Sequence, residues 1–164
     1  MNTETALTRY RTFLLGLSGF IFLGTLVELW ANDHYHSLLQ MIPIGLSLLA
    51  LLALGLADLR PRSASLRFLQ GVMLLVLLGG ALGIYEHLSG NLAFALEIQP
   101  NASLASTLIA MLKGANPLLA PVILALGGLT ALAATLSHPA LTKIPLLQPA
   151  KASPAQEQLP GKHW

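Results

Sequence analysis

The amino-acid sequence predicts an all-α membrane protein with four antiparallel transmembrane helices. Of its 164 residues, 54% are hydrophobic and only 10% are charged, whereas a soluble domain is about 25% charged. The mean hydropathy is +0.68. Such a chain cannot cover a surface that faces water, and it is too apolar to be intrinsically disordered. Its length is that of one domain, so we assign residues 1–136 to a transmembrane domain and 137–164 to a tail.

The first two expected spans cover residues 12–30 and 38–57. Each is long enough to cross a hydrocarbon core of about 30 Å, which takes about 20 helical residues. The first follows two arginines, as a signal peptide would. Its apolar run before Glu28 is longer than the roughly 7–15 residues of a signal sequence, so we expect it to stay in the mature chain. The second has no charge and ends before Pro61, because a residue that precedes proline disfavours the helical conformation.

The third and fourth expected spans cover residues 67–88 and 117–136. Ser63 or Ser65 suits the N-cap of the third helix, because a serine side chain accepts a hydrogen bond from the first turn. Pro117 suits the first turn of the fourth helix, where its missing N–H costs no hydrogen bond. Short connections between the spans predict that neighbouring helices run in opposite directions, with one long outer loop between the third and the fourth.

That long outer loop has structure of its own. Ser103 suits an N-cap, and from there to Lys113 the apolar residues fall on one helical face. The pattern is typical of a short interfacial helix that lies on the bilayer. It fits equally well an extension of the fourth span that is kinked at Asn116 and Pro117. The tail, residues 137–164, has prolines spaced too closely for a helix, so we expect it to be disordered.

The basic residues predict the orientation, because lysine and arginine are kept on the cytoplasmic side. Eight of the nine fall on one side of the expected spans, and only Lys113 falls on the other. The eight are Arg9, Arg11, Arg60, Arg62, Arg67, Lys143, Lys151 and Lys162. Both termini are therefore expected in the cytoplasm. The richness in leucine and alanine and the compact loops favour a bacterial inner membrane.

Carboxylates and imidazoles gather on the predicted outer side. Glu28 lies near the outer end of the first span, and Glu86 and His87 lie at the outer end of the third. His34 and His36 follow the first span and share a face if the loop is extended. These side chains bind divalent metals, and histidine favours zinc, copper and iron. We therefore predict a zinc, copper or iron site formed by Glu28, His34, His36, Glu86 and His87.

Glycines predict how the first and third spans meet. Gly83 belongs to a Gly-x-x-x-Gly pair, a spacing that lets membrane helices approach closely, and Gly24 lies one turn from Glu28. If the third span packs its glycine face on Gly24, Glu28 meets Glu86 or His87. Metal–ligand bonds of about 2 Å would then place their ligand atoms roughly 3–5 Å apart. The same residues also fit a proton-sharing carboxylate–imidazole pair or a solvated acidic face.

Several absences narrow the function. No charge lies in the middle of a span, which argues against an ion or proton pump. Nine basic residues are too few for nucleic-acid binding, and without cysteine there is no disulfide or thiol chemistry. No phosphate-binding or hydrolase motif occurs. Whether the protein is an enzyme stays open at this stage.

Two classes of function remain. In the first, a small polytopic membrane protein binds a divalent metal ion or a redox cofactor at its outer face. A haem held by His87 and His36 is the less favoured cofactor. In the second, the protein is a non-catalytic subunit or assembly factor that offers its helices to the lipid bilayer and to protein partners or a second copy. The first class requires the predicted outer side chains to meet, and the second does not.

Overall fold

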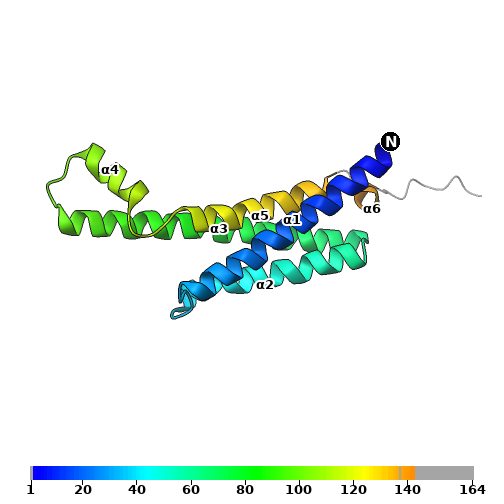
Figure 1. Ribbon diagram of the computed structural model, residues 1–164, viewed down its shortest axis with the longest axis horizontal. Coiled ribbons are helices and arrows are strands. Elements are labelled where there is room, and N and C mark those ends of the chain that lie inside the picture. Colours follow the sequence, from blue (N-terminus) through cyan, green and yellow to red (C-terminus); the bar gives the residue numbers. More distant parts are fainter. Residues whose placement is uncertain (1, 137, 143–164) are drawn as a thin grey trace, which may run out of the picture.

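The chain folds into helices joined by short connections. The computed structural model describes residues 2–136 and 138–142, and within them it has helices and no strand (Figure 1). In chain order the helices are α1 (Thr3–Ala31), α2 (Leu38–Leu59), α3 (Ser63–Ile98), α4 (Leu104–Lys113), α5 (Leu119–Thr135) and α6 (Pro139–Thr142). Three of them, α1, α2 and α3, are long and apolar enough to cross a membrane. The all-helical fold is therefore confirmed within the described residues, and the three long helices are compatible with an integral membrane protein, whereas α5, with 17 residues, is shorter than these three.

Local sequence explains where the helices begin. The Ser37 side chain accepts a hydrogen bond from the backbone N–H of Gln40, and the Gln40 side chain accepts one from the N–H of Ser37, which together cap α2. Ser103 caps α4, as predicted. At the start of α3, Ser65 bonds the backbone of Arg62, while Ser63 is the first helical residue. These caps satisfy N–H groups that have no partner inside the helix.

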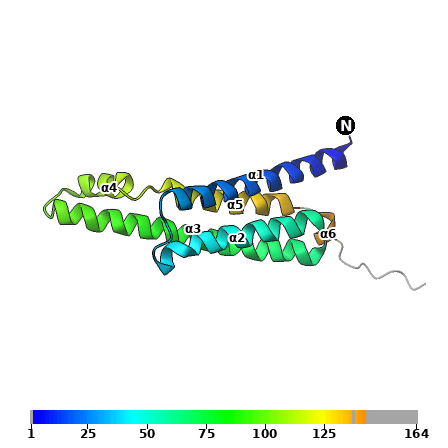
Figure 2. The ribbon, with the colours of Figure 1, turned by 60° about the horizontal axis from the view of Figure 1, so that its bottom comes forward.

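Four helices, α1, α2, α3 and α5, lie side by side (Figures 1 and 2). Both α1 and α3 pack against α2 and against α5, but within the described residues no Cα atom of α1 lies within 8 Å of one of α3, so the two backbones do not approach closely. The expected contact between the first and third spans is therefore wrong. A Cβ added to Gly24 of α1 would have no neighbour within 4 Å, whereas a Cβ on Gly83 of α3 would lie 2.8 Å from the Pro121 Cβ of α5. The glycine face that was expected to receive α1 instead meets α5 at Gly83 and the Leu46 side chain of α2 at Gly79.

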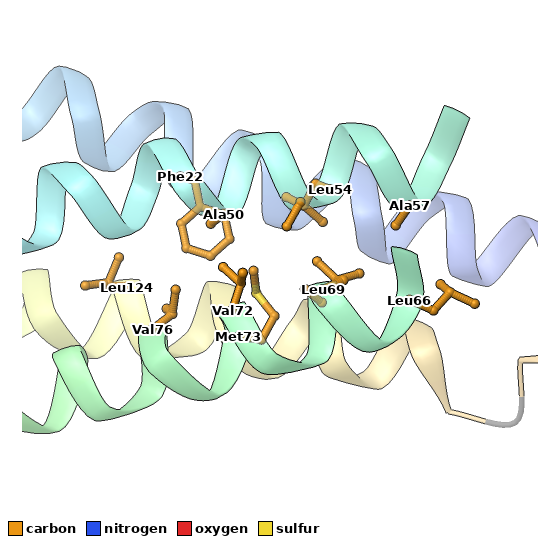
Figure 3. Packing of buried hydrophobic residues seen from close by; sticks show 12 residues of the cluster. Phe22, Ala50, Leu54, Ala57, Leu66, Leu69, Val72, Met73, Val76 and Leu124 are labelled. Atoms are coloured by element: carbon orange, nitrogen blue, oxygen red, sulfur yellow. The ribbon is translucent and has the colours of Figure 1, made fainter. Parts of the chain in front are cut away.

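The core is apolar and contains few large side chains. Phe22, Leu69, Met73 and Val76 are fully buried and point into the space between the helices (Figure 3). Small residues let the backbones approach, and a Cβ on Gly127 of α5 would lie 2.9 Å from the Ile21 side chain of α1. At the same place Ser18 Oγ donates a 3.0 Å hydrogen bond to the Gly127 carbonyl. The α1–α5 contact is thus as tight as the contact between α3 and α5.

Helix α3 extends well beyond the expected span. Its 36 residues correspond to about 54 Å at 1.5 Å per residue, against a hydrocarbon core of about 30 Å. The last part of α3, residues 88–98, projects past the other long helices, and α4 lies alongside it (Figure 2). We call residues 88–98 and α4 the arm. The sequence places no helix breaker before Pro100, so α3 continues through what was expected to be loop.

The arm decides between the alternatives for the loop. Helix α4 is separated from α5 by residues 114–118, so it is not a kinked extension of the fourth span. It packs along the end of α3 instead of across the end of the bundle (Figure 2). A short helix, α6, forms at the start of the tail that we expected to be without helix. Residues 143–164 of that tail lie outside the described residues.

Candidate functional site

A cavity of about 380 Å³ lies where α1 ends and α5 begins. Helices α1, α2, α3 and α5 and the connection after α1 all contribute to its lining. Four of the five residues predicted to form the site line this cavity, and they are Glu28, His34, Glu86 and His87. The fifth, His36, does not belong to the lining. The fold therefore brings most of the predicted group to one cavity, although the backbones of α1 and α3 do not approach closely.

His87 is held in a defined orientation by the start of α5. Its Nδ1 atom lies 2.7 Å from the carbonyl oxygen of Pro117. Because a carbonyl only accepts hydrogen bonds, Nδ1 must carry the proton in this contact. The Nε2 atom is then the ring nitrogen left to bind a ligand, and in the neutral imidazole it is an acceptor. Pro117, in the connection that precedes α5, thus supplies the carbonyl that orients His87.

His34 reaches the same cavity from a tightly folded loop. Its backbone N–H donates a 2.8 Å hydrogen bond to the Leu29 carbonyl, and Asp33 before it has a left-handed backbone with φ of 50°. Partial burial, and then the nearby charge of His87, lower the pKa of His34 below its ordinary value. The two imidazoles therefore lie close enough to repel each other when both are protonated. Near neutral pH, His34 is expected to be uncharged.

The two carboxylates of the lining have no basic partner. Glu28 is exposed on the last turn of α1, and Glu86 is half-buried on α3. The structure gives neither side chain a hydrogen bond or an ion pair within residues 2–136 and 138–142. No lysine or arginine of the described chain lines the cavity. The lining therefore carries two acceptor-only carboxylates and no described lysine or arginine.

The predicted metal site is not present as a preformed cluster. Among the described residues, no group of three or more histidine, aspartate or glutamate side chains is placed to hold one ion. His36 instead lies beside Tyr35, with ring centroids 4.8 Å apart, and the Tyr35 hydroxyl donates to Asp33. The physical reason is the diagonal placement of α1 and α3, which leaves Glu28 and Glu86 across a cavity from each other. The metal prediction therefore gains no support from the geometry.

Asn91 is a buried residue next to the site that the sequence analysis missed. Its side chain is 2% exposed. Its Nδ2 donates 3.0 Å hydrogen bonds to the carbonyls of Met111 and Asn116, and its Oδ1 accepts a 2.8 Å bond from the Asn116 N–H. A Cβ on Gly114 would collide with this side chain. Because Asn91 lies one turn after His87, both residues hold the segment between α4 and α5 on one face of α3.

The chain was also compared with known proteins. No protein-family model, curated protein or solved structure matches it. Its function is therefore argued from the cavity alone.

Proposed function

We propose that this protein is a four-span integral membrane protein that binds a cationic ligand in the cavity between α1, α2, α3 and α5. The proposal takes α5 as the fourth span, antiparallel to its neighbours. Its 17 residues are about 25 Å long, at the lower limit of the roughly 17–25 residues that span a bilayer. The start of α1, the α2–α3 turn and the first turns of α3 carry five arginines, and these segments lie at the end opposite the cavity (Figure 2).

This arrangement supports the predicted orientation. Arginine clusters favour the cytoplasmic face, so the cavity opens on the outer side, which is the periplasm if the membrane is a bacterial inner membrane. Lys113 is the basic residue of the arm, at the other end of the molecule. A ligand would then reach the cavity from outside the cell or from the outer leaflet.

The observation that carries the proposal is the unpaired charge of Glu28 and Glu86. Both carboxylates line a cavity with apolar walls, and no described lysine or arginine joins them there. Glu86 is half-buried, and removing a carboxylate from bulk water is unfavourable unless a positive charge or hydrogen-bond donors compensate it. Glu28 is exposed and adds a second negative charge to the lining. A cationic ligand supplies this compensation. The lowered pKa of His34 leaves it uncharged near neutral pH, so it adds an acceptor without adding positive charge.

A divalent metal ion is one cation that such a site could take. The contact between His87 Nδ1 and the Pro117 carbonyl favours this candidate, because metal-ligating histidines usually donate their other ring N–H to such a group. Zinc, copper or iron binding would require Glu28, His34 or Glu86 to change rotamer, since no three-residue group is preformed among the described residues. The haem alternative paired His87 with His36, and only His87 lines the cavity.

Binding to the purified protein in lipid nanodiscs tests the proposal. Zinc chloride and 2-phenylethylamine are titrated separately and followed by calorimetry, with empty nanodiscs as the blank. We expect at least one cation to bind saturably. The double variant Glu28→Gln/Glu86→Gln should weaken that binding by about tenfold or more, because a hydrogen bond to a charged group contributes roughly 1.5–3 kcal/mol. Glu97→Gln is the matched control, because Glu97 lies outside the cavity. Absence of saturable binding by both probes would refute the proposal.

The arm supports a second candidate function, a non-catalytic subunit or assembly factor of a larger complex. Apolar side chains of the arm remain exposed beyond the bundle, with Phe94 at 54% and Leu104 at 76%. An apolar surface outside the membrane is typical of a contact with another protein. Native gel electrophoresis of mildly solubilised membranes tests this alternative. If it is correct, Phe94→Ser with Leu104→Ser should release the protein from a large assembly to its own mass.

A further inference from the structure

We infer that the cation taken by this cavity is an amphiphilic primary amine, with an ammonium group at the rim and an apolar body inside. The inference rests on the proposed cation-binding function and specifies its ligand. Size is the first reason. The cavity measures about 380 Å³, within the roughly 300–1,000 Å³ of small-molecule sites, whereas a metal ion sits about 2 Å from each ligand atom. A bare ion would leave most of the space unfilled.

The inner wall supplies the second reason. Below the carboxylates the lining is apolar, with contributions from Leu29, Ile42, Leu82, Pro121 and Leu124. Leu82 precedes Glu86 by four residues, so the two side chains lie on one face of α3, with Leu82 one turn deeper in the bundle. A ligand whose charge contacts Glu86 therefore places its next atoms against Leu82. Each methylene group buried there would tighten binding roughly threefold to fourfold.

Hydrogen-bonding capacity supplies the third reason. The carboxylates of Glu28 and Glu86 only accept hydrogen bonds, and His87 Nε2 accepts when the ring is neutral, because Nδ1 donates to Pro117. Pro43 has no N–H to offer the Leu39 carbonyl, and both residues line the cavity. The lining thus offers charged acceptors beside the amide side chains of Asn32, Gln40 and Asn116. A primary ammonium group has three donors, whereas a quaternary ammonium has none, so the primary amine fits this rim best.

Three small water-soluble probes with the same apolar body test the charge and the donors. They are 2-phenylethylamine, 2-phenylethanol and trimethyl-(2-phenylethyl)ammonium, each titrated into the protein in nanodiscs with subtraction of empty nanodiscs. We expect the amine to bind about tenfold or more tightly than either analogue, because only the amine offers charge and donors together. Equal affinity for the amine and the alcohol would overturn the inference.

Variants then locate the bound amine. Glu28→Gln and Glu86→Gln should each weaken amine binding about tenfold, while Glu97→Gln leaves it unchanged. Leu82→Asn should weaken amine binding about tenfold and leave zinc binding unchanged, because only the amine has an apolar body that contacts Leu82. Each variant is used only if it keeps the wild-type unfolding temperature, and Glu28, being exposed, provides a substitution that does not disturb the core. Amine binding that survives both glutamate substitutions would overturn the assignment to this cavity.

The outcomes separate this inference from the proposed function. Saturable zinc binding without amine binding would refute the amine and leave a cation-binding protein. Binding of neither probe would refute both. Tight amine binding that depends on Glu28, Glu86 and Leu82 would support both.

Discussion

Replacing Asn91 tests whether one buried side chain fixes the arm to the bundle. Asn91→Ala removes three hydrogen bonds, from Nδ2 to the carbonyls of Met111 and Asn116 and from the Asn116 N–H to Oδ1. At about 1 kcal/mol net for each bond, the loss is about 3 kcal/mol. A cavity of about 390 Å³ beside Asn91 lets water reach the released groups, which limits any further cost. This free energy should be lost from the arm and not from the core, since the buried cluster around Phe22 is not touched.

Asn91→Asp sharpens the test because it keeps the size of the side chain. It retains an acceptor for the Asn116 N–H but turns an oxygen toward the carbonyls of Met111 and Asn116, where Nδ2 now donates. We therefore expect this isosteric change to be at least as damaging as Asn91→Ala. If Asn91 acted through packing alone, Asn91→Asp would be milder than Asn91→Ala.

Hydrogen–deuterium exchange of the protein in nanodiscs measures the effect. A loss of about 3 kcal/mol corresponds to roughly a hundredfold faster exchange of the amides that open with the arm, while amides of α1 and α2 keep their rates. Asn101→Ala is the matched control, because Asn101 is an exposed asparagine at the tip of the same arm. Wild-type protection in both Asn91 variants would show that the three hydrogen bonds do not hold the arm.

Three further predictions concern packing, pH and topology. Gly83→Leu should destabilise the fold by roughly 1–3 kcal/mol, because a Cβ at residue 83 would lie 2.8 Å from the Pro121 Cβ. Gly24→Leu should leave the unfolding temperature unchanged or raise it, because a Cβ at residue 24 has no neighbour within 4 Å. Partial burial and then the charge of Arg11 lower the pKa of His138 below 6.5, so stability should fall as pH drops below about 6.5 and stay constant above it. In an NMR titration, Arg11→Gln should raise the pKa of His138 only part of the way back to 6.5, because burial is the larger cause of its lowering. A reporter that works only outside the cytoplasm should be active when inserted at Asn101 and inactive at the α2–α3 turn, and the reverse pattern would contradict the orientation.

The sequence alone predicted the features that depend on composition and on position along the chain. Apolar runs and the scarcity of charge predicted an all-helical membrane protein, because a helix is the way for a single apolar segment to satisfy its backbone in lipid. The cap at Ser103 was predicted because it depends on neighbouring residues alone. Glu28, His34, Glu86 and His87 were found as a group because all four lie near the ends of apolar segments on the same expected side.

Which helices touch was decided only by the tertiary structure. In a membrane helix, the side facing lipid is as apolar as the side facing another helix, so hydrophobic periodicity does not reveal the neighbour. Gly83 therefore predicted a close approach correctly but not its partner, which is α5 and not α1, and the tight contact at Gly127 was missed for the same reason. The structure also decided that His34 lines the cavity and His36 does not, because the path of the loop after α1, with its left-handed residue Asp33, cannot be derived from residue spacing. Asn91 lies in a segment that the sequence predicts to be loop. In the structure α3 continues to Ile98 and α4 folds back on it, and this long-range packing buries the Asn91 side chain.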